Sequence, residues 1–396
     1  MRLKPDTPAF VLLLAFLTMI GPLSTDIFLP SMPAMAVIFH TTPAAIQATL
    51  TAYFIGFALA QLAHGPISDR IGRRPVLIAG LAAYTIASFL CIVAPSVELL
   101  VAGRFVQSVA AAGPIILART IVRDIHSGVR AGQLLSVMAS IMGLIPILAP
   151  VAGGFLEANF GWQSTFWVMT LAGVAGFGIV AIALPETIRE RRTEPLSILS
   201  IAQSYAVVAR SRIFLAYAAL ICFAYSGLII YVGTSAFIVQ GRYGLSAVAY
   251  GLAFACGAVA FVGGTVLGRR IAKHGTLSRA VGFGVAFLAA GGVLLPLCVA
   301  LGPLHVASFV VPMAVYMIGI GIVIPQSLAA ALTPFPERAG AASSLLGFLH
   351  MGSGAIVLWA AGTFFGADPL ANVCVLGVSG VTAALVYLAT MRVRAA

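Results

Sequence analysis

Twelve apolar segments, each long enough to cross a bilayer as a helix, account for most of this 396-residue sequence. A spanning helix needs about 20 mainly apolar residues, and the polar stretches between these segments are short. The predicted spans are 9–31, 43–64, 75–95, 97–121, 133–156, 162–184, 212–239, 246–268, 279–301, 304–331, 340–365 and 370–391. With 61% hydrophobic and 8% charged residues, the sequence does not fit a soluble, disordered or nucleic-acid-binding protein. We predict an all-α integral membrane protein.

A polar stretch near the middle of the chain separates the sixth and seventh spans. It runs from Pro185 to Arg212 and is rich in charged residues. A weak repeat supports the same division, since GPISDRIGRR at 65–74 and GTVLGRRIAK at 264–273 are offset by 199 residues in a chain of 396. Such an offset is typical of a duplicated six-helix unit. We predict an N-terminal six-helix bundle at 1–184, a cytoplasmic linker at 185–211 and a C-terminal six-helix bundle at 212–396.

The distribution of basic residues predicts how the spans are oriented. The chain carries 22 Lys and Arg against 11 Asp and Glu, for a formal charge of +11. If the N-terminus is cytoplasmic, all Lys and Arg residues except Arg104 and Arg242 lie in cytoplasmic segments. Cytoplasmic loops of membrane proteins carry this positive excess. The charge therefore reflects topology and not a nucleic-acid partner, and both termini are predicted to be cytoplasmic.

Asp26 is the one acidic residue deep inside a predicted span. A charge in hydrocarbon costs at least about 2.5 to 3.5 kcal/mol, so such a residue is a candidate for function. Arg104 lies in the fourth span at a similar depth from the same side, because each helical residue adds about 1.5 Å. We therefore predict that Asp26 and Arg104 contact each other. Two roles stay open for the pair: proton coupling, or a fixed ion pair between the first and fourth helices.

Five short motifs give the sequence a more specific resemblance. They are Gly65–Val76 (GPISDRIGRRPV), Thr25–Pro30 (TDIFLP), Arg104–Gln107 (RFVQ), Ala149–Gly154 (APVAGG) and Pro185–Thr187 (PET). The first resembles the signature loop between helices two and three of the major facilitator superfamily. Together they resemble its Bcr/CflA drug-resistance subfamily of drug:proton antiporters, whose relatives export phenicols and bicyclomycin. The resemblance covers essentially the whole chain.

The resemblance implies a major facilitator fold, with two pseudo-symmetric six-helix bundles and alternating access around a central site. It implies a monomeric, proton-coupled multidrug exporter of the bacterial inner membrane, driven by the proton gradient without a cofactor. Its partners would be a small-molecule drug or metabolite, protons and the lipid bilayer, and no nucleic acid. The pattern assigns proton coupling to Asp26 and Arg104, and substrate binding to Asp26, Arg104, Gln107, Tyr225 and Tyr316. The last three have an alternative role as polar residues satisfied between helices.

The run from Gly65 to Arg74 is predicted to form a loop with a tight turn, because glycine tolerates positive φ. Asp69 is expected to pair with Arg70, Arg73 or a helix N-terminus. A conformational latch between the two halves is assigned to Gly65, Asp69, Arg70, Gly72, Arg73 and Arg74, the alternative being a simple topology signal. Close crossing and bending of the fifth helix are assigned to Pro150, Gly153 and Gly154.

Two departures from the subfamily pattern concern the substrate. Ala149 replaces a glycine before a proline, and Thr18 stands where several drug exporters carry a second acid. One acid paired with one arginine leaves no net negative charge, which favours neutral lipophilic drugs over cations. The alternative is an exporter of a natural metabolite, such as an amino acid or a sugar. An intramembrane enzyme is less favoured, because the sequence shows no buried Ser/His or metal-binding constellation.

His350 lies mid-span in the eleventh helix, either as a satisfied interhelical histidine or as a titrating group. The cysteines lack metal or disulfide spacing. They are predicted to be small buried hydrophobes, at positions Cys91, Cys222, Cys256, Cys298 and Cys374.

Overall fold

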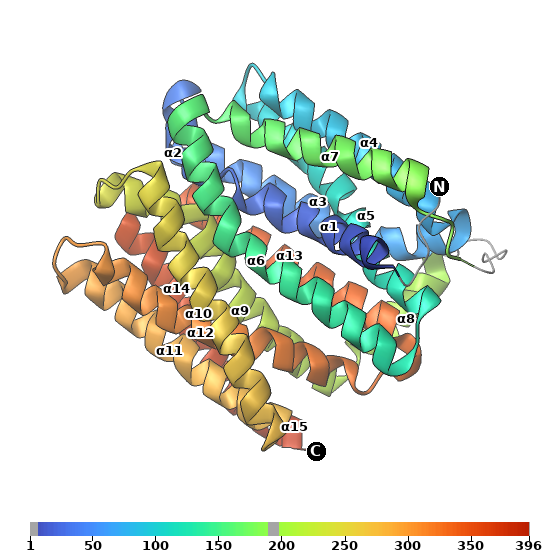
Figure 1. Cartoon of the computed structure of the whole chain (residues 1–396). Helices are drawn as coiled ribbons and strands as arrows, with labels where there is room; N and C mark the ends of the chain where they lie inside the picture. The colour runs from blue at the N-terminus through green and yellow to red at the C-terminus, as the bar shows by residue number, and fades with distance from the viewer. Residues whose placement is uncertain (1–6, 189–197, 396) are drawn as a thin grey trace.

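The computed structural model of the protein describes residues 7–188 and 198–395 (Figure 1). Twelve helical spans in these residues are long and apolar enough to cross a membrane. They are α1 (Pro8–Asp26) continued by the 3-10 helix η1 (Leu29–Ser31) and α2 (Met32–Ile38); α3 (Pro43–Ile71); α4 (Arg73–Ile92); α5 (Val97–Ile125); α6 (Gly128–Phe160); α7 (Gln163–Ala183); α9 (Arg212–Ala236) continued by the π-helix η2 (Phe237–Arg242); α10 (Ala247–Lys273); α11 (Leu277–Leu301); α12 (Ala307–Leu332); α13 (Ala339–Phe365), preceded by the 3-10 helix η3 (Pro336–Arg338); and α14 (Pro369–Ala389). Two short helices, α8 (Ile198–Ala209) and α15 (Met391–Ala395), complete the described residues, in which no strand occurs. The predicted all-α fold with twelve spans is confirmed.

Capping side chains mark the N-termini of six of the spans. The side chains that accept a hydrogen bond from the backbone N–H three residues later are Thr42, Ser96, Ser211, Ser246, Thr276 and Asp368. Such caps satisfy N–H groups outside the apolar run, and α11 and α14 begin one or two residues before the predicted spans. The largest extension is that of α6, which covers 128–160 where 133–156 was predicted and has no capping side chain.

Helices from the first and second halves of the chain lie on opposite sides of the molecule (Figure 1). The two groups meet along two seams, where α6 packs against α10 and α3 packs against α13. The short helix α8 packs on α13, and the hydroxyl of its Tyr205 donates to the Leu62 carbonyl of α3 at 3.3 Å. Residues 189–197 of the predicted linker lie outside the described residues.

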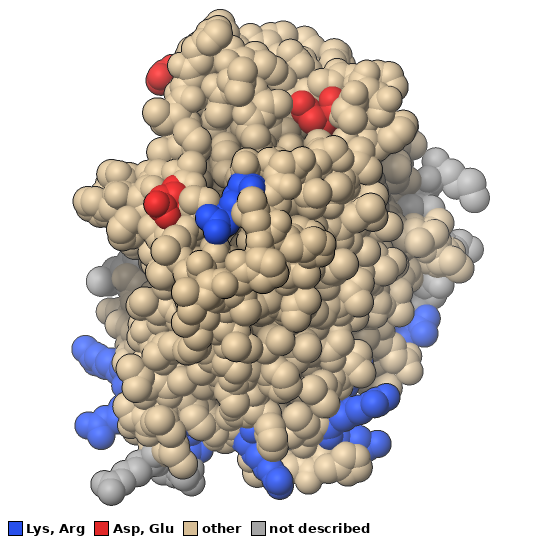
Figure 2. Space-filling view, turned by 90° about the vertical axis from the view of Figure 1, so that its left-hand side faces the viewer, with Lys and Arg blue, Asp and Glu red and all other residues tan. Residues whose placement is uncertain are grey.

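Charged side chains separate to the two ends of the bundle. The acidic end carries Glu98, Glu157 and Asp368 together with Arg242, and the arginine-rich end is the opposite one, where α3, α5, α7 and α10 finish. Figure 2 shows acidic side chains toward one end of the visible face, most basic ones at the other, and an uncharged belt between them. Of the basic residues in the topology prediction, Arg2, Lys4, Arg189, Arg191 and Arg192 lie outside the described residues.

Small residues bring α6 close to its neighbours near the acidic end. A Cβ atom on Gly153 would overlap the Ile27 carbonyl, and one on Gly154 would overlap the Ala247 carbonyl of α10. The contact is reciprocal, since Gly251 of α10 lies against the Pro150 carbonyl of α6. The glycines thus allow the close crossing. Because α6 is one continuous helix through Pro150, the bending of this helix stays a prediction.

Candidate functional site

Asp26 is the last residue of α1 and is 6% exposed. The Thr25 hydroxyl donates a hydrogen bond to Asp26 Oδ1 at 2.8 Å. Three residues further along the chain, η1 packs against α9 and α10 of the C-terminal half. Asp26 is therefore a buried carboxylate at the end of α1 that leads into this contact between the halves.

Arg104 of α5 is completely buried inside the N-terminal half. Its Nη2 donates to the Ser24 carbonyl at 2.9 Å, and its Nη1 donates to Gln107 Oε1 at 2.5 Å. The guanidinium also stacks between the rings of Phe28 and Tyr53, 4.4 and 4.5 Å from their centroids. Since α1 ends at Asp26, the arginine sits at the negative end of that helix. The helix end and the aromatic faces stabilise its charge.

The predicted contact between Asp26 and Arg104 is wrong. Both ion pairs among the described residues belong to another part of the molecule, and neither includes Asp26 or Arg104. The depth estimate placed the two residues near each other along the helix axis, but it did not include helix rotation. Residues two positions apart on a helix point about 200° apart. The Ser24 hydroxyl is hydrogen-bonded to the Tyr84 hydroxyl of α4 at 2.6 Å, so the Asp26 side chain, two residues on, is expected on the other side of α1.

Two of the three predicted polar ligands are packed within their own halves. The Gln107 amide is fully buried and donates to Ser88 Oγ at 2.7 Å. The Tyr316 ring of α12 is fully buried against Gly227 and Gly380 of neighbouring helices. Gln107 matches the alternative of a polar residue satisfied between helices, whereas the buried Tyr316 hydroxyl has no hydrogen-bond partner among the described residues. The structure does not bring the two side chains together.

Tyr225 of α9 occupies a different kind of position, because its side chain is only half-buried. Its ring is 4.5 Å from that of His350 in a T-shaped arrangement, and its hydroxyl lies 3.1 Å from Met351 Sδ. His350 Nδ1 is 2.7 Å from the Leu346 carbonyl of its own helix. Of the predicted substrate residues, Tyr225 is therefore the one that is only half-buried.

The run from Gly65 to Arg74 is mostly helical, which corrects the predicted loop. The helix α3 continues to Ile71, and Gly65 lies inside it with open space around its Cα. The turn is confined to Gly72, whose φ of 114° is in the region that favours glycine. The expectation of positive φ is therefore confirmed for Gly72 and wrong for Gly65.

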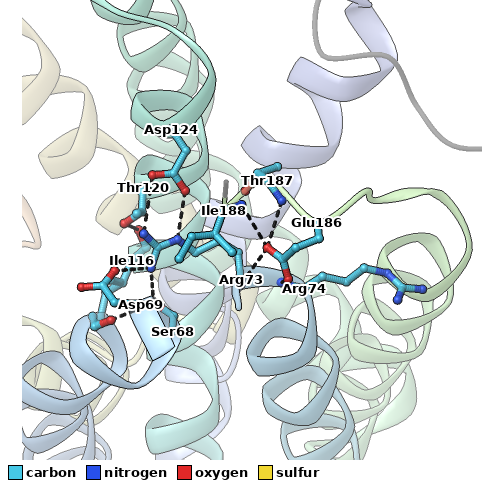
Figure 3. Close-up of polar contacts among 11 residues, drawn as sticks. Ser68, Asp69, Arg73, Arg74, Ile116, Thr120, Asp124, Glu186, Thr187 and Ile188 are labelled. Atoms are coloured by element: carbon cyan, nitrogen blue, oxygen red, sulfur yellow. Dashed lines mark hydrogen bonds and ion pairs between the residues drawn. The ribbon is translucent and has the colours of Figure 1, made fainter. Parts of the chain in front are cut away.

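Arg73 forms the centre of a polar cluster at the arginine-rich end, shown in Figure 3. Its Nη1 lies 2.5 Å from Asp69 Oδ1 and donates to Ser68 Oγ at 2.6 Å. Its Nε lies 2.9 Å from Asp124 Oδ2 of α5. Of the alternatives for Asp69, the structure selects Arg73. Asp124 was missed by the sequence analysis because no local pattern joins residues 51 positions apart.

Glu186 completes this cluster by capping α4 (Figure 3). The N-cap of α4 is Gly72, which has no side chain to offer. The Glu186 carboxylate accepts instead from the backbone N–H groups of Arg73 at 3.0 Å and Arg74 at 3.3 Å. Glu186 belongs to the Pro185–Thr187 motif, but its role as a helix cap was not predicted. Apart from Glu186, which lies in the predicted linker just after α7, these partners come from the N-terminal half, so the cluster joins α3, α4 and α5 to the segment that follows α7.

Comparison with known proteins gives the family. A sequence model described as Major Facilitator Superfamily matches residues 14–358. The chain belongs to the major facilitator superfamily. It is 32% identical to the uncharacterized MFS-type transporter YdgK of Bacillus subtilis, over 88% of this chain and 87% of that protein. It is also 29% identical to a bicyclomycin resistance protein homolog of Haemophilus influenzae, over 90% and 89% of the two chains.

A third relative of this superfamily member is the multidrug resistance protein MdtL of Escherichia coli, 32% identical over 87% of this chain and 86% of that protein. The names agree with the resemblance to drug-resistance antiporters. Among solved structures, the nucleoside transporter NupG has a TM-score of 0.77 at 12% identity, covering 96% and 98% of the two chains. A D-xylose-proton symporter has a TM-score of 0.76 at 14% identity, covering 96% of each. Such likeness shows the fold alone.

Membership in this superfamily makes the protein a multi-pass membrane transporter and not an enzyme. Among the described residues, no group of three or more His, Cys, Asp or Glu side chains is placed to hold a metal ion. The prediction for the cysteines holds for Cys91, which is buried, and is wrong for Cys256 and Cys374, which are exposed. In a membrane-spanning helix, an outward-facing cysteine contacts lipid as a small apolar side chain.

Proposed function

We propose that this transporter is a proton-coupled exporter of neutral lipophilic drugs such as phenicols or bicyclomycin. It would work as a monomer in the bacterial inner membrane, with the arginine-rich end and both termini in the cytoplasm, by the positive-inside rule. The proton gradient would drive it without a cofactor. Relatives named as bicyclomycin resistance and multidrug resistance proteins support the substrate class.

Asp26 is the observation that carries the proposal. It is a buried carboxylate at the end of α1, just before the η1 turn that packs on the C-terminal half, and its one side-chain hydrogen bond in the described residues comes from the neutral Thr25 hydroxyl. A buried carboxylate without a cationic partner can shed its charge by binding a proton. Protonation then changes the electrostatics next to the contact of η1 with α9 and α10. This coupling replaces the direct exchange with Arg104 that the sequence suggested.

Arg104 contributes by holding α1 in place. Its bond to the Ser24 carbonyl holds the helix end that carries Asp26, and its bond to Gln107 of its own helix orients the guanidinium. Because its charge is stabilised within the N-terminal half, it does not pass a proton in this mechanism. The half-buried Tyr225 of α9 offers a ring and a hydroxyl to an uncharged ligand from the C-terminal half. One carboxyl that is neutral when protonated favours neutral drugs over cations.

Transport by purified protein in proteoliposomes tests the proposal. With an imposed proton gradient, chloramphenicol movement and proton movement are followed together in the wild type and in Asp26→Asn. The variant keeps the shape of a protonated carboxyl, so we expect drug binding to persist and gradient-driven transport to be lost. Glu98→Gln, an exposed acid at the acidic end, is the matched control and is expected to transport normally. Full proton-coupled transport by Asp26→Asn would exclude Asp26 from the mechanism.

A further inference from the structure

The two halves are joined at the acidic end by a single side-chain hydrogen bond. Gln240 Nε2 of η2 donates to the Pro30 carbonyl of η1 at 2.8 Å. Within the described residues, it is the only hydrogen bond that directly links residues 7–184 to residues 212–395. The acidic end is therefore held closed across the halves by few polar contacts.

Both partners lie where a regular helix changes form. The first span passes from α1 through the 3-10 turn η1, and the seventh span ends in the π-helix η2. Such departures are rare inside helices and often occur at functional positions. Here the irregular segments of the first and seventh spans meet each other, since η1 contacts α9 and α2 contacts η2.

Close packing of small residues surrounds this hydrogen bond. The α6–α10 seam joins the halves through Gly154 against Ala247 and Gly251 against Pro150. These contacts are van der Waals contacts without side-chain hydrogen bonds, so they can separate and reform without leaving polar groups unpaired. Opening of this end then depends on the polar groups that the closure buries.

One buried polar group opposes the closed arrangement. Gln47 of α3 is 1% exposed at the α3–α13 seam, beside Gly362, and both its amide nitrogen and its amide oxygen lack a hydrogen-bond partner. A buried amide without partners is unfavourable compared with the same amide in water. Separation of α3 from α13 near the acidic end would hydrate this side chain.

We propose that the Gln240–Pro30 hydrogen bond is the clasp that keeps the acidic end closed, and that the unpaired Gln47 amide favours its opening. The clasp and the opposing amide set the balance between two access states. This inference rests on the proposed function for its role in the transport cycle. It deepens that function by naming the residues that gate the acidic end.

Distances between spin labels across each end test the proposal without drug or gradient. In full-length protein with its five cysteines replaced by alanine, labels at Phe160→Cys and Leu304→Cys report on the acidic end. A second pair at Val129→Cys and His274→Cys reports on the arginine-rich end. All four positions are exposed. Transport is not needed for this measurement, so a failure of the drug:proton proposal would not affect its outcome.

Gln240→Leu removes the hydrogen-bond donor. We expect the ratio of open to closed acidic ends to rise about two- to tenfold, the change that corresponds to the loss of one hydrogen bond. Gln240→Glu places an acceptor against the Pro30 carbonyl and should open the end at least as much. Adding Gln47→Leu to Gln240→Leu should return the ratio toward the wild type by about fivefold or more. Gln163→Leu, an exposed glutamine at the same end, is the control and should change nothing.

Two results would overturn the inference. Unchanged distances at the acidic end in both Gln240 variants would show that this bond does not hold the end closed. A further increase of the open population on adding Gln47→Leu would show that the Gln47 amide favours closure.

Discussion

Arg73 is paired with two carboxylates that differ in exposure, and this difference predicts unequal effects of removing them. The side chain of Asp124 is 21% exposed and that of Asp69 is 39% exposed, while Arg73 is 7% exposed. A charge-assisted hydrogen bond in a buried setting contributes about 1.5 to 3 kcal/mol. A pair that is more than a third exposed is screened and contributes about 0.2 to 1 kcal/mol. We therefore expect Asp124→Asn to destabilise the protein more than Asp69→Asn, by about 1 to 2 kcal/mol.

The assay is the midpoint of thermal unfolding of purified protein in detergent, followed by tryptophan fluorescence. Each aspartate variant is measured alone and together with Arg73→Met, which forms a double-mutant cycle. Without the arginine, Asp69 and Asp124 are two carboxylates near each other, so Asp124→Asn should then raise the midpoint instead of lowering it. Equal losses for the two single variants, or a loss from Asp124→Asn that persists beside Arg73→Met, would refute the reasoning.

Three further changes have expected outcomes. Gly72→Ala should lower the free energy of unfolding by about 1 kcal/mol or more, and with it the thermal midpoint, because φ is positive and a Cβ would crowd Glu186. Gly65→Ala, inside α3, is the control and should not lower the midpoint. Arg104→Met, which keeps the volume but loses the bonds to Ser24 and Gln107, should lower the midpoint and reduce drug transport, and Arg104→Lys should restore transport only in part. Asp69→Asn should leave membrane expression normal and reduce export in whole cells if the Arg73 cluster also acts as a conformational latch, whereas wild-type export would leave the cluster with a topological role.

The helices and their number followed from the sequence because they depend on local properties. A run of about 20 apolar residues has one stable form in hydrocarbon, the helix that satisfies its own backbone groups. For the same reason the turn at Gly72 and the close packing at Gly153 and Gly154 could be predicted from residue type. Each needs only a small side chain at one position of the chain.

The partners of the buried polar side chains were decided by the tertiary structure. Asp26 and Arg104 have matching depths along their helices, but Arg104 bonds the Ser24 carbonyl, and neither ion pair of the described residues includes Asp26. Likewise, Glu186 caps a helix that begins 113 residues earlier, and Gln240 bonds a carbonyl 210 residues away. Depth in a membrane depends on position along one helix, whereas contact depends on how several helices are rotated and packed. That packing is a property of the whole bundle, so no local pattern of residues contains it.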